Sequence, residues 1–122
     1  MRPESGDSAR LWDMLQSARQ AQEYVRGYTW ERYIADALIR DATERRIEII
    51  GEAARGVSRE FRDAHPEIAW KGIMAQRHVL AHKYEVIDHQ RIWTILTIHL
   101  PELIGQLEPL VPRPPQEELD AQ

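Results

Sequence analysis

Apolar residues recur every three or four positions along most of the chain, which is the spacing of one face of an amphipathic helix. The pattern predicts helices over residues 8–26, 30–40, 41–64, 70–84 and 88–108, with a break near residues 40–41. No segment alternates between apolar and polar residues over the length of a strand. The sequence therefore predicts an all-α fold, an up-and-down bundle of four or five helices with short connections.

Residues that cap helices mark several of the predicted starts. Asp7 or Ser8 can cap the first helix, Thr29 the second and Asp88 the last, because their side chains accept hydrogen bonds from the first turn. Gly27 follows the first apolar stripe and is suited to end that helix.

Glycine and proline interrupt the stripes at defined places. Gly51 lies inside the third helix, where it costs about 1 kcal/mol relative to alanine but allows another helix to approach closely. Pro66 disfavours the helical conformation at His65, so the third helix ends by there. Pro101 lies within the last helix and should kink it, because proline has no backbone N–H to donate.

Length and composition fit one soluble domain. The chain has 122 residues, of which 43% are hydrophobic, and it has no cysteine, which excludes disulfides and thiolate metal sites. Its apolar runs are too short to span a membrane, and the first ten residues do not resemble a signal peptide, so we expect a cytoplasmic protein. We expect a helical domain over 8–111, between a flexible start at 1–7 and a disordered tail at 112–122.

Charge is distributed unevenly along the chain. Sixteen basic and twenty acidic residues give a net charge of −4, which is not the basic balance of a protein that grips duplex DNA. Residues 68–84 nevertheless contain no Asp or Glu, and the stretch 77–84 reads Arg-His-Val-Leu-Ala-His-Lys-Tyr. This local positive charge favours an anionic ligand, and phosphate is the commonest candidate.

The same stretch supplies groups that RNA cleavage without a metal requires: a base, an acid and a fixed cation. Histidine titrates near pH ~6.5 and can serve as base or acid. Arginine stays charged and can bind two phosphate oxygens. Arg77 and His82 therefore fit two of the three roles, and the third falls to His78 or to His82 of another subunit.

Helical spacing does not by itself bring these groups together. At about 100° per residue, His78 and His82 lie about 40° apart on a helix, whereas Arg77 and His82 lie about 140° apart. Either the helix end loosens, or two copies of the stretch meet across a two-fold axis. We favour a homodimer with two arginines and two histidines in one cleft.

Two other interpretations of these residues compete with catalysis. His78 and His82 have the i, i+4 spacing of helical zinc ligands, but a third ligand is required, and His89, Glu85 and Asp88 are poor candidates. We therefore predict no metal site. From spacing alone, an arginine and a histidine on a helix are more often ordinary surface residues.

Three further groups of residues are left out of the predicted site. His65 lies in a proline-containing turn, and His99 lies among apolar residues, where a core or interface role is more usual. The tryptophans are scattered along the chain and fit packing better than a platform for base stacking; they are Trp12, Trp30, Trp70 and Trp93.

Arg77, His82 and Tyr84 form the pattern Arg, four residues, His, one residue, Tyr. With the polar His78 after the arginine, this pattern resembles the signature of the HepT-like group of the HEPN superfamily. The flanking sequence is also similar to that group, and the resemblance covers roughly residues 8–111. The similar flanking segments are 44–53, 61–70, Asp88 and Trp93.

The resemblance implies a helical domain that dimerises through the motif-bearing helix. It also implies a metal-independent endoribonuclease without a cofactor, which acts as the toxin of a toxin–antitoxin pair. Arg77 would then stabilise the scissile phosphate, His82 would act as acid–base, and His78 would support them. Tyr84 would be the residue to which an MntA-like nucleotidyltransferase antitoxin transfers AMP. The alternative is a non-catalytic module that binds a nucleotide or a protein partner.

Overall fold

The structure, a computed structural model, describes residues 5–81 and 88–111, with the backbone alone for residues 5 and 76–81. Every regular element in these ranges is helical, and no strand occurs among them, which confirms the all-α class. The elements are α1 (Ser5–Tyr24), α2 (Trp30–Ala35), α3 (Ala37–Gly56), α4 (Arg59–Ala64), α5 (Trp70–Ala81), α6 (His89–Thr94), the π-helix η1 (Ile95–His99) and α7 (Leu100–Leu107).

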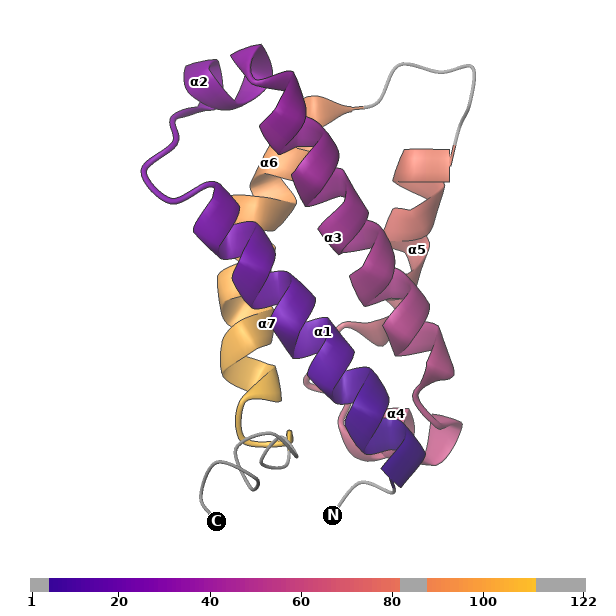
Figure 1. The fold of residues 1–122 in the computed structure, drawn as a ribbon. Coiled ribbons are helices and arrows are strands. Elements are labelled where there is room, and N and C mark those ends of the chain that lie inside the picture. Colours follow the sequence, from indigo (N-terminus) through magenta and orange to yellow (C-terminus); the bar gives the residue numbers. More distant parts are fainter. Residues whose placement is uncertain (1–4, 82–87, 112–122) are drawn as a thin grey trace.

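The long helices run up and down beside one another (Figure 1). α1 packs most extensively on α3, α3 on α5, and α1 on α7, while α6, η1 and α7 follow one another without a gap. The short helices α2 and α4 lie at opposite ends of the bundle (Figure 1). The predicted up-and-down bundle is therefore confirmed, whereas dimerisation through the motif-bearing helix stays a prediction.

The core is built from the apolar stripes that the sequence predicts. Leu11, Leu15 and Ala18 of α1 are at most 2% exposed, and they face the buried side of α3. Tyr33 is also fully buried; its ring lies 5.0 Å from that of Trp93, and its hydroxyl is 3.3 Å from the Thr43 hydroxyl. Further apolar residues that recur at the three- and four-residue spacing and are buried are Ala21, Val25, Ile47, Ile50, Ala54, Val57, Phe61, Ile92, Leu96, Leu100, Leu103 and Leu107.

The first helix begins earlier than predicted, and Asp7 does not cap it. α1 starts at Ser5, so Asp7 lies in its first turn with only 7% of its surface exposed. Its carboxylate accepts two hydrogen bonds of 2.7 Å, one from the backbone N–H and one from the hydroxyl of Ser58. Ser58 in turn caps α4 by accepting from the Phe61 N–H. Asp7 therefore fastens the start of α1 to the start of α4.

We expect Asp7→Ala to lower the free energy of unfolding by about 1–3 kcal/mol, because two charge-assisted hydrogen bonds lose their acceptor. Chemical denaturation of the purified variant measures the change. Asp13→Ala is the matched control, since Asp13 is exposed on the same helix and its replacement should change stability by no more than about 0.5 kcal/mol. Equal effects of the two substitutions would contradict the role of Asp7.

The predicted helix over residues 41–64 is two helices. α3 begins at Ala37 and ends at Gly56, since Val57 is extended (φ −72°, ψ 137°) and Ser58 then caps α4. The break between the second and third predicted helices lies at Asp36, not near residues 40–41. The Asp36 side chain accepts from the Ile39 N–H, so this residue ends α2 and begins α3. The end of α4 at Ala64, before Pro66, is as predicted.

The predicted starts of the second, fourth and fifth helices agree with the structure, while the predicted end of the fourth helix at residue 84 lies outside the described residues. Thr29 and Asp88 cap α2 and α6, and Gly27 has the positive φ (74°) of a residue that ends a helix. Instead of a simple kink at Pro101, the preceding residues form a π-helix, in which the Leu100 N–H bonds to the carbonyl of Ile95. Because Pro101 has no N–H, its position in the first turn of α7 suits this change of spacing.

Gly51 brings α5 close to α3, as the sequence predicts. A Cβ atom at Gly51 would lie 3.3 Å from the backbone oxygen of Ile73, which is tighter than ordinary contact. The bare backbone at this position lets the motif-bearing helix lie against the middle of α3. The placement of the candidate site therefore depends on this glycine.

Candidate functional site

The motif begins on α5 and continues beyond it. Arg77 and His78 lie in the second half of α5, where the structure describes the backbone alone. His82 and Tyr84 lie outside the described residues. Whether Arg77, His82 and Tyr84 converge on one phosphate therefore stays a prediction.

The start of α5 is fixed by contacts of Trp70. The indole is 7% exposed, packs edge-on against the Phe61 ring with 6.5 Å between ring centres, and donates a 2.9 Å hydrogen bond from Nε1 to the His65 carbonyl. One turn later, Ile73 is 7% exposed and belongs to the core. These contacts and the close approach at Gly51 set the direction in which α5 carries the motif.

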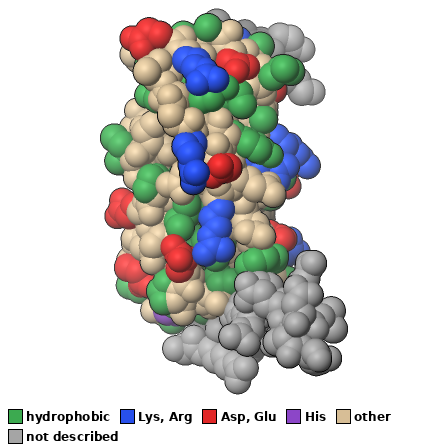
Figure 2. All heavy atoms as spheres, turned by 60° about the vertical axis from the view of Figure 1, so that its left-hand side comes forward, with side chains coloured by type: hydrophobic (Ala, Val, Ile, Leu, Met, Phe, Trp, Pro, Cys, Tyr) green, Lys and Arg blue, Asp and Glu red, His purple; other side chains and the backbone are tan. Residues whose placement is uncertain are grey.

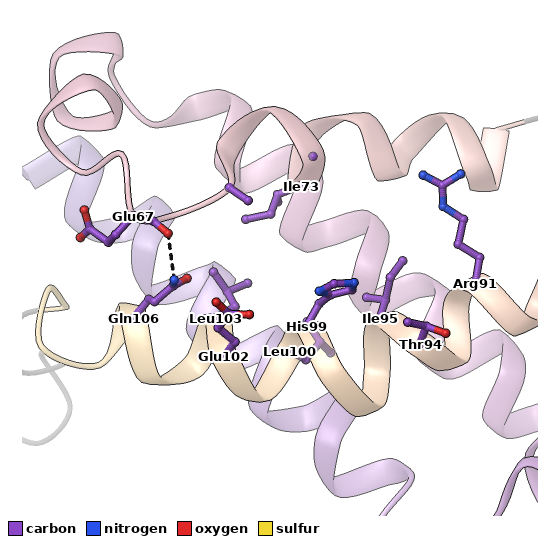
Figure 3. Close-up of a pocket in the computed structure, with 12 residues that line it drawn as sticks. Glu67, Ile73, Arg91, Thr94, Ile95, His99, Leu100, Glu102, Leu103 and Gln106 are labelled. Atoms are coloured by element: carbon purple, nitrogen blue, oxygen red, sulfur yellow. Dashed lines mark hydrogen bonds between the residues drawn. The ribbon is translucent and has the colours of Figure 1, made fainter.

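A groove of about 280 Å³ separates α5 from the helical run of α6, η1 and α7 (Figure 3). Gly72 and Ile73 form part of its α5 wall, and Arg91, Thr94 and His99 lie on the opposite wall. Arg77 comes four residues after Ile73, so helical spacing puts it on the same face of α5, one turn further along. The motif therefore starts on the face of α5 that borders the groove.

A partly buried polar cluster holds the start of α6, immediately after the motif segment, against α3. The Arg40 guanidinium lies 3.4 Å from Nε2 of His89, and Nδ1 of His89 lies 3.6 Å from the Glu44 carboxylate. The side chains of His89 and Glu44 are only 21% and 16% exposed. This cluster connects the chain that leaves the motif to the same helix on which α5 packs.

Burial shifts the pKa values of Glu44 and His89 in opposite directions. Burial raises the pKa of Glu44, and the Asp41 charge raises it further, while Arg40 opposes the shift. Burial lowers the pKa of His89, and the charge of Arg40 lowers it further, while Asp88 opposes it. A neutral His89 can accept at Nε2 from the Arg40 guanidinium, so one of its two ring nitrogens already has a partner, which makes it a poor third zinc ligand.

His99 and Arg91 are groove residues that the sequence reasoning missed. His99 is exposed and lines the groove, so the expected core position is wrong, whereas the expected interface position stays a prediction. Arg91, Ile95 and His99 follow one another at four-residue steps and share one wall of the groove. That spacing was visible in the sequence, but only the structure shows that this wall faces α5.

Among the side chains that the structure describes, those of residues 6–75 and 88–111, no cluster of three or more His, Asp or Glu residues is arranged to hold a metal ion. This finding does not reach His78 and His82, so it does not test the zinc interpretation. None of the described helices is both long enough and apolar enough to cross a membrane.

Comparison with known proteins connects this helical bundle to ribonucleases. The family described as ribonuclease HepT-like matches residues 14–110. The chain is 35% identical to "Putative RNase MJ1380" of Methanocaldococcus jannaschii over 100 residues. These residues cover 82% of this chain and 92% of that protein. The chain is 31% identical over 100 residues to "Probable ribonuclease HepT" of Thermococcus cleftensis, covering 82% and 91%.

A third relative, "Putative RNase TTE0752" of Caldanaerobacter subterraneus, is 33% identical over 101 residues, which cover 83% of this chain and 90% of that protein. No solved structure is a significant match. The matched region contains α3, α5 and the whole of the motif, as well as both walls of the groove. The chain therefore belongs to the HepT-like family of the HEPN superfamily.

Proposed function

We propose that this chain is an endoribonuclease that cleaves RNA without a metal and acts as the toxin of a toxin–antitoxin pair. The observation that carries the proposal is the match to the HepT-like ribonuclease family over residues 14–110, with Arg77, His82 and Tyr84 present at the motif spacing. The groove beside the motif face of α5 offers space for a ligand, which supports the same conclusion.

In the proposed reaction, His82 removes the proton from a ribose 2′-hydroxyl, and the resulting oxygen attacks the neighbouring phosphorus. Arg77 binds the non-bridging phosphate oxygens and stabilises the charge that develops on them. The P–O bond to the 5′ oxygen of the next nucleotide then breaks, and an acid protonates that oxygen. The acid is His78 or His82 of a second copy, and the products are a cyclic phosphate and a free 5′-hydroxyl.

The second copy is part of the proposal because α5 can supply only some of these groups on one face. Arg77 and His82 lie about 140° apart if the helical spacing continues to His82. Two α5 helices beside a two-fold axis would put an arginine and a histidine from different copies on opposite sides of one phosphate. Within the described residues α3 is the helix on which α5 packs extensively, so the proposed neighbour would pack on another face of α5.

The proposed site does not lie on the face formed around α1. Figure 2 shows the left-hand side of Figure 1 turned forward, and there acidic and basic side chains are mixed without a concentrated basic patch. Some of the charges on α1 pair: Arg19 with Glu108 at 3.4 Å, and Glu23 at 3.0 Å with Arg26 in the turn after the helix. A polyanion would gain little there, which supports the proposal that RNA binds on the α5 side.

The proposed antitoxin is a nucleotidyltransferase that transfers AMP from ATP to the hydroxyl of Tyr84 and releases pyrophosphate. The added nucleotide places a bulky negative charge two residues after His82 and repels the RNA phosphate. We expect the intact mass of the wild-type protein, incubated with ATP and its cognate nucleotidyltransferase, to rise by whole AMP units. We expect Tyr84→Phe to show no increase.

Tyr24→Phe is the matched control, because Tyr24 is an exposed tyrosine (37%) at the end of α1, outside the motif. That variant should gain the same mass as the wild type. AMP on Tyr84→Phe would place the modified residue elsewhere. No added mass on the wild type would show that the antitoxin inhibits by binding alone.

A further inference from the structure

The polar side chains of the groove differ in whether they already have partners. The Thr94 hydroxyl donates to the Gln90 carbonyl at 3.0 Å, and the Gln106 amide donates to the Glu67 carbonyl at 2.8 Å. The Glu67 carboxylate lies 3.1 Å from Nδ1 of His65. Three lining side chains form no hydrogen bond or ion pair with any residue in the described part of the chain; they are Arg91, His99 and Glu102.

These three side chains are ordered along the groove. Figure 3 shows Arg91 at one end, His99 in the middle, and Glu102 toward the end that holds Glu67 and Gln106. The Asp88 carboxylate lies near Arg91 in sequence, but it accepts a hydrogen bond of 3.1 Å from the Arg91 backbone N–H. The groove therefore has a cationic end at Arg91 and an acidic end at Glu67 and Glu102.

The cationic end is the one nearer the motif. α5 and the run from α6 to α7 are antiparallel, so moving from His99 back to Arg91 follows α5 from Ile73 toward its C-terminal end (Figure 3). Arg77 lies in that direction, four residues after Ile73 on the same face. In Figure 3 the Arg91 side chain points from α6 toward α5.

From this arrangement we propose that Arg91 binds a backbone phosphate of the RNA substrate next to the one that is cleaved. The proposal rests on the proposed ribonuclease function and extends it to a binding residue across the groove from the motif. A guanidinium without a partner among the described residues can donate two parallel hydrogen bonds to a phosphate without breaking any ion pair in that part of the chain. The strand follows the cationic end of the groove, because Glu67 and Glu102 repel phosphate at the other end.

The test separates RNA binding from chemistry. We expect Arg91→Ala to raise KM for a short single-stranded RNA about tenfold with kcat changed less than about twofold, because a contact that is equal in the ground and transition states is lost. Arg91→Lys should have a KM between those of the wild type and Arg91→Ala, since lysine keeps the positive charge but cannot donate two parallel hydrogen bonds to one phosphate. Arg26→Ala is the matched control: it removes the same charge from a side chain that is 79% exposed in the turn after α1, and it should leave KM unchanged.

A second measurement does not depend on turnover. The His82→Ala variant is used because its RNA stays intact. In this variant, the slope of log binding constant against log salt concentration should become shallower by about 0.7 when Arg91 is also replaced with alanine. That change is expected for the loss of one phosphate contact on a single strand. Size-exclusion chromatography with light scattering, run on the same samples, should show the same oligomeric state for every variant.

The outcomes distinguish this proposal from the ribonuclease proposal. If the wild type cleaves RNA and Arg91→Ala has the same KM and salt dependence, the proposed contact between Arg91 and phosphate is wrong, whereas the proposed ribonuclease function is supported. If Arg91→Ala changes the oligomeric state, the groove is an interface between copies, and the phosphate contact is likewise overturned. If the wild type binds RNA but does not cleave it, the ribonuclease proposal fails, while the salt dependence still tests Arg91.

Discussion

His82→Ala is expected to abolish both RNA cleavage and toxicity, with kcat reduced by about 10²–10⁴-fold, the usual contribution of a positioned acid or base. Alanine can neither accept the proton of the ribose hydroxyl nor return one to the leaving oxygen. The loss should lie in kcat, because Arg77 and the proposed contact at Arg91 still bind the phosphate backbone. Single-turnover cleavage of a labelled RNA and growth of cells that express the variant measure the two effects.

The controls for this prediction address folding, titration and metal. His82→Asn keeps a polar side chain that does not titrate, and it should be as inactive as alanine, while both variants keep the wild-type unfolding temperature. Cleavage by the wild type should persist in EDTA; its loss would favour a zinc site that includes His78 and His82. Full toxicity of a folded His82→Ala variant would leave the non-catalytic binding module as the better account.

Gly51→Leu is expected to lower the free energy of unfolding by about 1–3 kcal/mol and to reduce RNA cleavage as well, because the new side chain forces α5 away from α3. The nearest atom that it meets is the backbone oxygen of Ile73, which cannot rotate out of the way as a side chain could. Displacing α5 moves the motif with it, so activity is affected even where the protein stays folded. Denaturation curves and cleavage rates on the same preparation measure both effects.

Two variants separate crowding at Gly51 from the general effect of replacing a helical glycine. Gly105→Leu makes the same change in α7 at an exposed position, where a new Cβ meets no atom within 4 Å, so it should be neutral or stabilising. Gly51→Ala should fall between the two, because its better helix propensity offsets part of the close contact. Equal stability of Gly51→Leu and Gly105→Leu would show that the position of α5 does not depend on the close contact between Gly51 and the backbone of Ile73.

Much of the fold could be predicted because its determinants are local. Apolar stripes at three- and four-residue steps put residues such as Leu11, Ile47 and Leu96 in the core, where the structure has them. Thr29 and Asp88 cap the helices that follow them because the acceptor and the donor are only three residues apart. The resemblance to the HepT-like family likewise rested on short spacings, and the match to that family confirms it.

The features that were missed depend on residues far apart in the chain. Asp7 looked like a cap for its own helix, but its partner Ser58 is 51 positions away. The cluster of Arg40 and His89 depends on a tertiary contact between residues 49 positions apart. The π-helix before Pro101 depends on a choice between two helical hydrogen-bond patterns. The groove has walls from α5 and from α6–η1–α7, so neither stripe alone could reveal Arg91 as a candidate binding residue.

The packing of α5 has a consequence for how this protein can evolve. Among the described helices, α3 is the one on which α5 packs extensively, while Arg91 and His99 stand on the opposite wall of the groove and outside the core. Mutations at Arg91 or His99 therefore leave the contact between α3 and α5 intact. If our proposal holds, substitutions at these two positions can change which RNA is bound while the structure of α5 stays the same. Related proteins can then differ in their RNA substrates and still share one cleavage mechanism.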